Sequence, residues 1–187
     1  TEGVHGLELN VSCPNVDSGG MEFGVDASML GALVEACRGA TTLPLIVKLS
    51  PNVTSVVDMA RVCESAGADG ISLINTLLGM AINVETRRAE LSRGMGGLSG
   101  PALKPVAVRM VWQVYNAVSL PIIGMGGIST TEDALEFIIA GASAIAVGTA
   151  NFVNPRTTME VVDGLESYFR RHEIPNLAAL RGTCIVG

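Results

Sequence analysis

Short apolar runs recur along this chain and alternate with longer stretches of helical spacing. The first run places Leu7, Leu9 and Val11 at alternating positions, and the later runs are almost continuously apolar. Runs of this kind, separated by glycine-containing turns, are typical of buried strands in a parallel sheet covered by helices. The predicted strands are Gly6–Ser12, Leu45–Leu49, Gly70–Asn75, Pro121–Gly124 and Ala144–Val147.

Capping signals delimit the helices between these strands. One helix is predicted to start near Thr54, a good N-cap residue, and to stop at Gly67. Another opens with the capping-box pattern of residues 129–132 and ends at Gly141. The remaining helices are predicted over Ala27–Arg38, Lys104–Ala117 and Thr158–His172.

The order of these elements predicts an α/β fold of repeated β/α units. Residues 66–70 and 140–144 resemble each other, and each leads from a helix end into the next strand. Polar and glycine residues gather directly after the strands, as in a TIM (β/α)8 barrel, whose active site lies at that end. A doubly wound open sheet is the alternative, but it would usually carry G-x-G-x-x-G after its first strand, and none is present there. The residues that follow the strands are Cys13, Ser50, Asn75, Gly126, Gly127, Gly148 and Thr149.

The number of strands is smaller than a complete barrel requires. A TIM barrel has eight strands and typically ~250 residues, whereas this chain of 187 residues shows about five strands. We therefore expect residues 1–187 to be the C-terminal portion of a single barrel domain, with the N-terminal strands preceding Thr1. A chain without those strands is expected to have weak activity or none.

The composition of the chain argues against several classes of function. Apolar residues make up 48% of the chain and charged residues 16%, which indicates a well-packed globular protein. The net charge of −6, without a basic run, disfavours a nucleic-acid surface, and no apolar stretch reaches the length of a membrane span. None of the four cysteines forms a C-x-x-C pair, so we expect no metal site in the chain and a reducing, cytoplasmic location.

The most informative segment is Asn10-Val11-Ser12-Cys13-Pro14-Asn15, at the end of the first strand. Pro14 keeps Cys13 out of a helix, and the amides of Asn10 and Asn15 flank the thiol. A thiol held at a strand end between two amides is a candidate acid or base beside a polar, planar substrate. The alternative is a small buried cysteine in a turn, since free cysteines are usually buried and inert.

Two glycine loops predict a phosphate site. Residues 124–128 precede a predicted helix, and Gly148-Thr149 follow the next strand. Glycine lets backbone amides approach an anion, and the loops after the last two strands of a barrel commonly bind phosphate. The alternative is that tight turns between strands and helices simply favour glycine. A further glycine run, residues 94–100, lies in an insertion and is either a ligand-clasping loop or a flexible one.

Two other strand ends add polar groups. Lys48 shares a strand face with Ile46 and Ser50. Because a buried lysine needs a counter-charge, an anionic ligand would explain it, and the alternative is a lysine that reaches solvent at a frayed strand end. Asn75 and Thr76 offer an amide and a hydroxyl at the same rim, although Asn is common at strand ends.

Several motifs together resemble the dihydroorotate dehydrogenase family over essentially the whole chain. They are ELNVSCPN, VKLSPNVT, INTLLGM, GGLSGPALKP, IIGMGGI and AVGTANF, in the family's order and spacing. The cysteine of the first motif resembles the cytosolic class 1 enzymes, and the second and third motifs look most like the NAD-linked 1B subclass. The resemblance implies FMN-dependent oxidation of dihydroorotate to orotate in de novo pyrimidine biosynthesis.

The same resemblance implies roles for individual residues. Cys13 would be the base that removes the C5 proton of dihydroorotate, while hydride passes from C6 to FMN. Lys48 would face the N1/O2 edge of the flavin and stabilise negative charge on the reduced ring. The implied substrate ligands are Asn10, Asn15, Asn75 and Thr76, and the implied cofactor ligands are Lys48, Gly97, Ser99, Gly100, Gly126, Gly127, Gly148 and Thr149.

The resemblance also implies partners: a homodimer, and an electron-transfer subunit that carries FAD and an iron–sulfur cluster. Three other functions stay open. The pyrimidine-reducing domain of dihydropyrimidine dehydrogenase is similar and also uses a loop cysteine. A tRNA dihydrouridine synthase has a similar Asn…Cys-Pro stretch, although the acidic balance argues against it. The third is a flavin-binding or purely structural fragment without catalysis.

Overall fold

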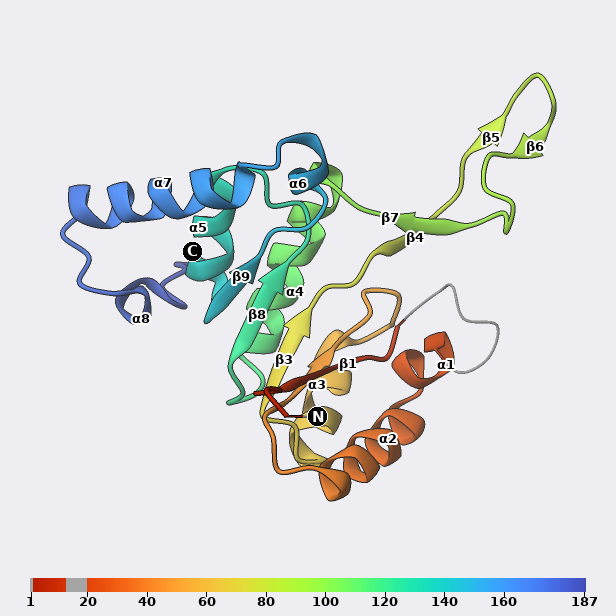
Figure 1. Ribbon diagram of the computed structural model, residues 1–187, viewed down its shortest axis with the longest axis horizontal. Helices are drawn as coiled ribbons and strands as arrows, with labels where there is room; N and C mark the ends of the chain where they lie inside the picture. The colour runs from red at the N-terminus through yellow and green to blue at the C-terminus, as the bar shows by residue number, and fades with distance from the viewer. Residues whose placement is uncertain (1, 13–19) are drawn as a thin grey trace.

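The centre of the molecule is a five-stranded parallel sheet, seen in a computed structural model that describes residues 2–12 and 20–187 (Figure 1). Each strand pairs in parallel with the next strand of the sheet along the chain. All five predicted strands are therefore confirmed. They are β1 (Leu7–Asn10), β2 (Leu45–Lys48), β3 (Gly70–Leu73), β8 (Ile122–Met125) and β9 (Ala144–Ala146).

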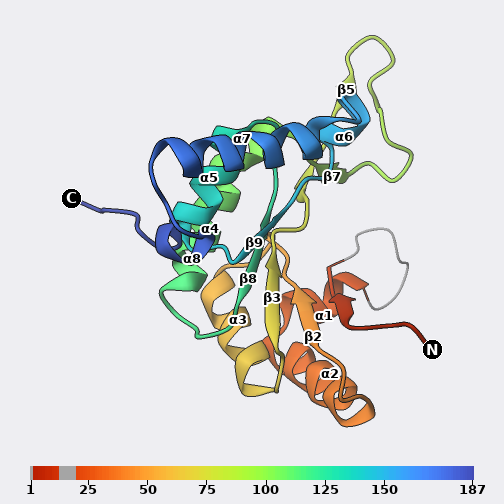
Figure 2. The same cartoon turned by 60° about the vertical axis from the view of Figure 1, so that its left-hand side comes forward.

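The helices form a row in which each long helix contacts the next one along the chain. Figure 2 shows α3, α4 and α5 on the same side of the strands. The five predicted helices are confirmed as α2 (Ala27–Ala40), α3 (Val56–Ser65), α4 (Lys104–Tyr115), α5 (Thr131–Ala140) and α7 (Thr157–Arg171). Shorter helical segments are α1 (Gly20–Val25), the 3-10 turn η1 (Pro101–Leu103), α6 (Ala150–Val153) and α8 (Leu177–Leu180).

Alternation along the strands gives the sheet two different faces. Val47, Ile71 and Ile122 are paired in register across β2, β3 and β8, and all three belong to the buried core. Burying each such side chain stabilises the fold by about 1.5–3 kcal/mol. The neighbouring row, which points to the other face, runs from Asn10 through Lys48 and Ser72 to Ile123, so it is polar on β1, β2 and β3 and apolar on β8. The apolar face thus packs against the helices, and the opposite face carries charged and polar groups along β1, β2 and β3.

The helix caps correct two details of the sequence prediction. α3 begins after Ser55, whose hydroxyl accepts a hydrogen bond from the Asp58 amide at 3.2 Å, so the prediction of Thr54 as the cap is wrong by one residue. The capping box of α5 is also shifted by one residue, since Thr130 is the N-cap and Asp133 supplies the reciprocal carboxylate. Serine and threonine are both favoured as N-caps, so the hydroxyl residues next to one another in these segments are all plausible caps in the sequence. The predicted end of α5 at Gly141, where φ is 128°, is confirmed.

The strand order argues against one of the two candidate architectures. A doubly wound sheet reverses its strand order and carries helices on both faces. The sheet of residues 2–12 and 20–187 runs β1-β2-β3-β8-β9 without reversal, so the doubly wound alternative is wrong for the part of the chain described. The α/β class is confirmed, and the sheet is open, with β1 and β9 at its edges. No helix within those ranges is long and apolar enough to cross a membrane.

The insertion between β3 and α4 forms an arm rather than an irregular loop. It extends away from the sheet as two short antiparallel ladders (Figure 1). Strands of two or three residues are too short to produce an alternating pattern in the sequence, which is why they were not predicted. The ladders pair β4 (Leu77–Gly79) with β7 (Gly96–Leu98), and β5 (Ile82–Asn83) with β6 (Arg88–Ala89).

A network of hydrogen bonds closes the amino-terminal ends of β2 and β3. The Asp69 carboxylate accepts from the Leu45 amide at 2.8 Å and from the Arg38 guanidinium at 2.7 Å. The same guanidinium donates to the carbonyls of Thr41 and Leu43. The Leu45 amide and the Arg38 charge lower the pKa of Asp69. These contacts tie the end of α2 to the sheet.

Candidate functional site

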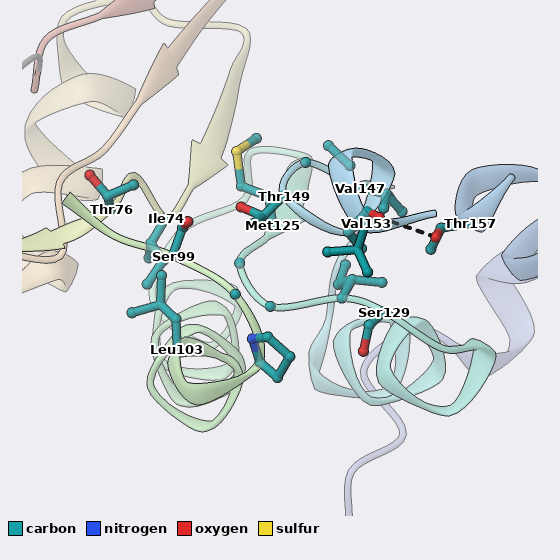
Figure 3. A pocket seen from close by; sticks show the side chains of 18 of the residues that line it. Ile74, Thr76, Ser99, Leu103, Met125, Ser129, Val147, Thr149, Val153 and Thr157 are labelled. Carbon is teal, nitrogen blue, oxygen red and sulfur yellow. Dashed lines mark hydrogen bonds between the residues drawn. The ribbon is translucent and has the colours of Figure 1, made fainter. Parts of the chain in front are cut away.

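A cavity of about 450 Å³ opens at the carboxyl ends of β2, β3, β8 and β9. In Figure 3, Ser99 and Leu103 lie on one side of it and Val147 and Val153 on the other. The carboxyl ends of parallel strands are where barrels and open α/β sheets place their ligand sites. The predicted site residues that line this one cavity are Lys48, Asn75, Thr76, Ser99, Gly100, Gly126, Gly127, Gly148 and Thr149.

Of the predicted site residues that the structure describes, two are not on the wall of this cavity. Asn10 lies beside it, hydrogen-bonded to Asn75. Gly97 lies in β7 and packs against Thr76, whose side chain a Cβ at position 97 would overlap. Packing against Thr76 at the base of the arm therefore explains why position 97 is a glycine. Cys13 and Asn15 lie outside the described residues.

The loop after β8 is built to expose its backbone amides. Gly126 and Gly127 have φ values of 124° and 80°, which L side chains rarely adopt. A Cβ at Gly127 would lie 2.7 Å from the Gly100 carbonyl oxygen, so this position also excludes any side chain by contact. Within residues 2–12 and 20–187, no hydrogen bond uses the amide nitrogen of either glycine. Two backbone donors are therefore available to a ligand.

The loop after β9 faces the same cavity. Gly148 and Thr149 line it, and their amide nitrogens are likewise used by no hydrogen bond in the described part of the chain. Behind them, Thr157 Oγ1 donates to the Asn154 carbonyl at 2.7 Å and fixes the turn that follows α6 (Figure 3). Four backbone donors from two loops form a site whose chemistry fits a phosphate group.

A buried carboxylate holds the first of these loops at its far end. Asp133 Oδ2 accepts from the amide and the hydroxyl of Ser129 and from the Thr130 amide, each at 2.9 Å. Its Oδ1 accepts from Lys104 Nζ at 2.7 Å. Burial would raise the pKa of this carboxyl, but Lys104 and the Ser129 and Thr130 donors outweigh it and lower the pKa to about 2. Asp133 is therefore ionised at neutral pH.

The part of the rim where β1 and β3 end is an amide cluster. Asn75 Nδ2 donates to Asn10 Oδ1 at 3.1 Å and to Ser12 Oγ at 2.5 Å. Asn75 Oδ1 accepts from the Thr76 amide at 2.8 Å. No hydrogen bond of the described residues uses Asn10 Nδ2. The cluster thus orients Asn75 firmly and leaves the amide donors of Asn10 open to a polar ligand.

Lys48 has a protein partner that sequence reasoning missed. Its Nζ lies 3.5 Å from Glu8 Oε1, and Glu8 Oε2 accepts a hydrogen bond from Ser72 Oγ at 2.8 Å. The side chain of Lys48 is 21% exposed, so a frayed, solvated lysine does not describe it. A counter-charge is thus present without a ligand. The signal in the sequence was the spacing of Glu8 and Asn10, which places both on the polar face of β1.

Asn52 is a second residue that sequence reasoning missed. Its Nδ2 donates to the Thr76 carbonyl at 3.0 Å, and its Oδ1 accepts from the Leu78 amide at 2.9 Å. It thereby joins the end of β2 to the base of the arm and fixes Thr76 at the rim. Its place directly after a strand, in the run Ser50-Pro51-Asn52, could have drawn attention to it.

Comparison with known proteins gives consistent results. A family model described as Dihydroorotate dehydrogenase matches residues 2–169. The "Dihydroorotate dehydrogenase B (NAD(+)), catalytic subunit" of Alkaliphilus metalliredigens is 58% identical over 177 residues, which cover 95% of this chain and 59% of that protein. The protein of the same name from Desulforamulus reducens is 57% identical over 181 residues, covering 97% and 60%.

A solved structure shares the fold. The crystal structure of DHODH from Eimeria tenella in complex with ferulenol matches with a TM-score of 0.79 and 28% identity, covering 96% of this chain and 54% of that chain. The chain thus spans about three fifths of the length of the curated relatives it matches.

Proposed function

Because the chain belongs to the dihydroorotate dehydrogenase family, we propose that it forms the FMN-binding part of a (β/α)8 barrel that oxidises dihydroorotate to orotate. The observation that carries the proposal is the single cavity that collects both glycine loops, Lys48 and the Asn75–Thr76 rim. The one-way order of the five strands, and the polar groups that β1, β2 and β3 carry on the second face of the sheet, support the barrel. In this proposal residues 1–187 are the C-terminal portion of that domain.

The residues present fit FMN. The four uncommitted amides of Gly126, Gly127, Gly148 and Thr149 suit its phosphate, and the apolar wall formed by Ile74, Leu103 and Met125 suits a flat ring system. Ser99 and Gly100 would border the chain between ring and phosphate. Lys48 would lie against the ring and stabilise the negative charge that it gains on reduction. When bound, FMN supplies the two-electron acceptor for the hydride from C6 of dihydroorotate.

The substrate side is the rim where β1 and β3 end. Asn10 and Asn75, with Asn15 and Thr76, would hydrogen-bond the pyrimidine, and the contacts within the amide cluster reduce the entropy lost on binding. Cys13 follows Ser12, which contacts Asn75, so its thiol would stand next to the substrate. It would take the C5 proton as a thiolate, the form in which cysteine is reactive.

The proposal extends to partners and location. The relatives carry the name of a catalytic subunit linked to NAD(+). We propose that this chain likewise passes its electrons to a separate subunit with FAD and an iron–sulfur cluster, that it forms a homodimer, and that it acts in pyrimidine biosynthesis in the cytoplasm.

The test is an anaerobic titration of the full-length protein, loaded with FMN and followed by its visible spectrum. Dihydroorotate should bleach the flavin band, and dihydrouracil should not. The Cys13→Ala variant should bind FMN normally and bleach far more slowly. Bleaching by dihydrouracil alone would favour a dihydropyrimidine dehydrogenase-like activity, and binding without bleaching by either would contradict the proposed oxidation.

A further inference from the structure

Lys104 supports the glycine loop after β8 in two ways, through its backbone nitrogen and through its side chain. Its backbone nitrogen lies under the loop, since a Cβ at Gly127 would approach it to 2.8 Å. Its side chain reaches forward, and Nζ donates to Asp133 Oδ1 at 2.7 Å and to Glu136 Oε1 at 2.6 Å. Lys104 itself does not line the cavity. One residue at the start of α4 therefore supports the loop from below and, through Asp133, holds its end.

The loop needs this support because of its own composition. Glycines at positions 126 and 127 permit the left-handed backbone but also leave it many other conformations. Amide donors favour an anion only when they are held in the binding geometry beforehand. Asp133 fixes residues 129 and 130 with its three hydrogen bonds, which reach the end of the loop nearest α5.

The charges beside the loop are a second reason why it needs Lys104. Asp133 and Glu136 place two carboxylates beside a loop that presents amides to an anion, and unpaired carboxylates would repel it. Lys104 lies between them and offsets one of the two negative charges. Their hydrogen bonds to Nζ raise the pKa of Lys104, so the lysine stays charged.

We propose that Lys104, acting through Asp133, is a positioning residue that holds the amides of residues 126–127 in place for the phosphate of the flavin. It touches neither the ring nor the substrate. The inference rests on the proposed function, since it concerns how that same FMN site is held. Its effect should therefore depend on the phosphate group and on nothing else in the ligand.

Riboflavin has the ring system of FMN without the phosphate. Comparing the two flavins therefore separates binding of the phosphate from binding of the ring. Binding of each flavin to the full-length apoprotein is measured by quenching of flavin fluorescence. Lys104→Met should lower the affinity for FMN about tenfold, as expected for one misplaced hydrogen bond to a charged group, and change riboflavin affinity by less than about twofold. Lys104→Arg, which keeps a cation that can reach Asp133, should recover most of the loss.

Arg109→Met is the matched control. It removes one cation from the same helix, where Arg109 donates to Gln113 at 2.7 Å and does not line the cavity. It should leave both flavin affinities unchanged. Asp133→Asn is the second variant, and it should reproduce the selective loss of FMN affinity if the lysine acts through that carboxylate.

Each outcome is decisive. A selective loss of FMN affinity in Lys104→Met and in Asp133→Asn supports the inference. Equal weakening of both flavins, or no change in either, would overturn it while leaving the FMN site in place. A wild-type protein that binds riboflavin as tightly as FMN would overturn the phosphate site of the proposed function, and the inference with it.

Discussion

At the amino-terminal ends of β2 and β3 the polar groups are paired with one another, whereas at the carboxyl ends of β8 and β9 several are not. Asp69 accepts from Leu45 and Arg38, and the guanidinium also bonds two carbonyls. The amides of Gly126, Gly127, Gly148 and Thr149, by contrast, have no partner within residues 2–12 and 20–187. One end of the sheet uses its polar groups to hold the chain together, and the other reserves them for a ligand, as in (β/α)8 enzymes.

The largest effect on FMN affinity should come from a substitution that moves the unbonded amides of the loop after β8. Gly127→Ala places a Cβ 2.7 Å from the Gly100 carbonyl oxygen at a φ of 80°, so the loop must shift. Two hydrogen bonds to a charged group would be lost or weakened, which corresponds to a loss of FMN affinity on the order of 100-fold.

The control for that substitution is Gly39→Ala, at a helical position where a Cβ meets nothing within 4 Å. It should raise the free energy of unfolding by about 0.5–1 kcal/mol and leave FMN affinity unchanged. Flavin titration and urea unfolding measure both quantities. A Gly127→Ala protein with wild-type affinity would show that the loop amides do not bind the flavin.

The second prediction concerns stability in acid. Asp133 has a pKa of about 2 in the folded protein, below the value of about 3.9 in unfolded chains. Its contribution is therefore fully present above pH ~4 and is lost as the pH falls through about 2. The shift corresponds to about 2–3 kcal/mol of unfolding free energy.

Urea unfolding of wild type and Asp133→Asn between pH 6 and pH 2.5 measures this contribution. The difference in unfolding free energy between them should shrink by most of that amount as the pH falls. Glu132→Gln, an exposed neighbour in the same turn, controls for the loss of one negative charge. A difference that stays constant across the range would contradict the assignment.

The third prediction tests the proposal that Lys48 lies against the flavin ring. Glu8→Gln removes the carboxylate 3.5 Å from Lys48 Nζ, which leaves the lysine charge less compensated. The flavin should then be reduced more easily, with a midpoint potential higher by on the order of 30 mV, equivalent to about 1.4 kcal/mol for two electrons. Ser72→Ala, which removes only the hydroxyl donor to Glu8, should leave the potential unchanged. An unchanged or lower potential in Glu8→Gln would show that Lys48 does not act on the ring.

The smallest effect on flavin binding should come from a substitution at the amino-terminal ends of β2 and β3. Arg38→Met removes the guanidinium that bonds Asp69 and the Leu43 carbonyl, and should lower the free energy of unfolding by about 1–2 kcal/mol. FMN affinity should stay within about twofold of wild type, because no bond of this network reaches the cavity. Any larger loss of flavin binding would mean that the two ends are not separable.

The elements and the rim could be predicted from the sequence because both depend on local patterns. Apolar runs marked the five strands, and glycine and amide residues directly after them marked the cavity wall. Such residues lie together whenever the strands are parallel, so the site follows once the fold class is known.

The partners of the site residues could not be predicted in the same way. Lys48 pairs with Glu8 across neighbouring strands, and Lys104 reaches Asp133 from a different helix. These contacts join positions far apart in the chain and depend on strand register and helix packing, which no local pattern encodes. The one-residue shift of the α5 cap has the same origin, since it follows the carboxylate that Lys104 holds.

The most direct test of the account is an amide NMR titration of the full-length apoprotein with FMN and, separately, with riboflavin. The account expects FMN to shift the amide resonances of Gly126, Gly127, Gly148 and Thr149, and riboflavin to leave them largely unchanged. The Leu45 amide, already bonded to Asp69, should move with neither flavin. Equal shifts of the four loop amides with both flavins, or shifts centred on Leu45, would contradict the claim that these loops are reserved for the phosphate.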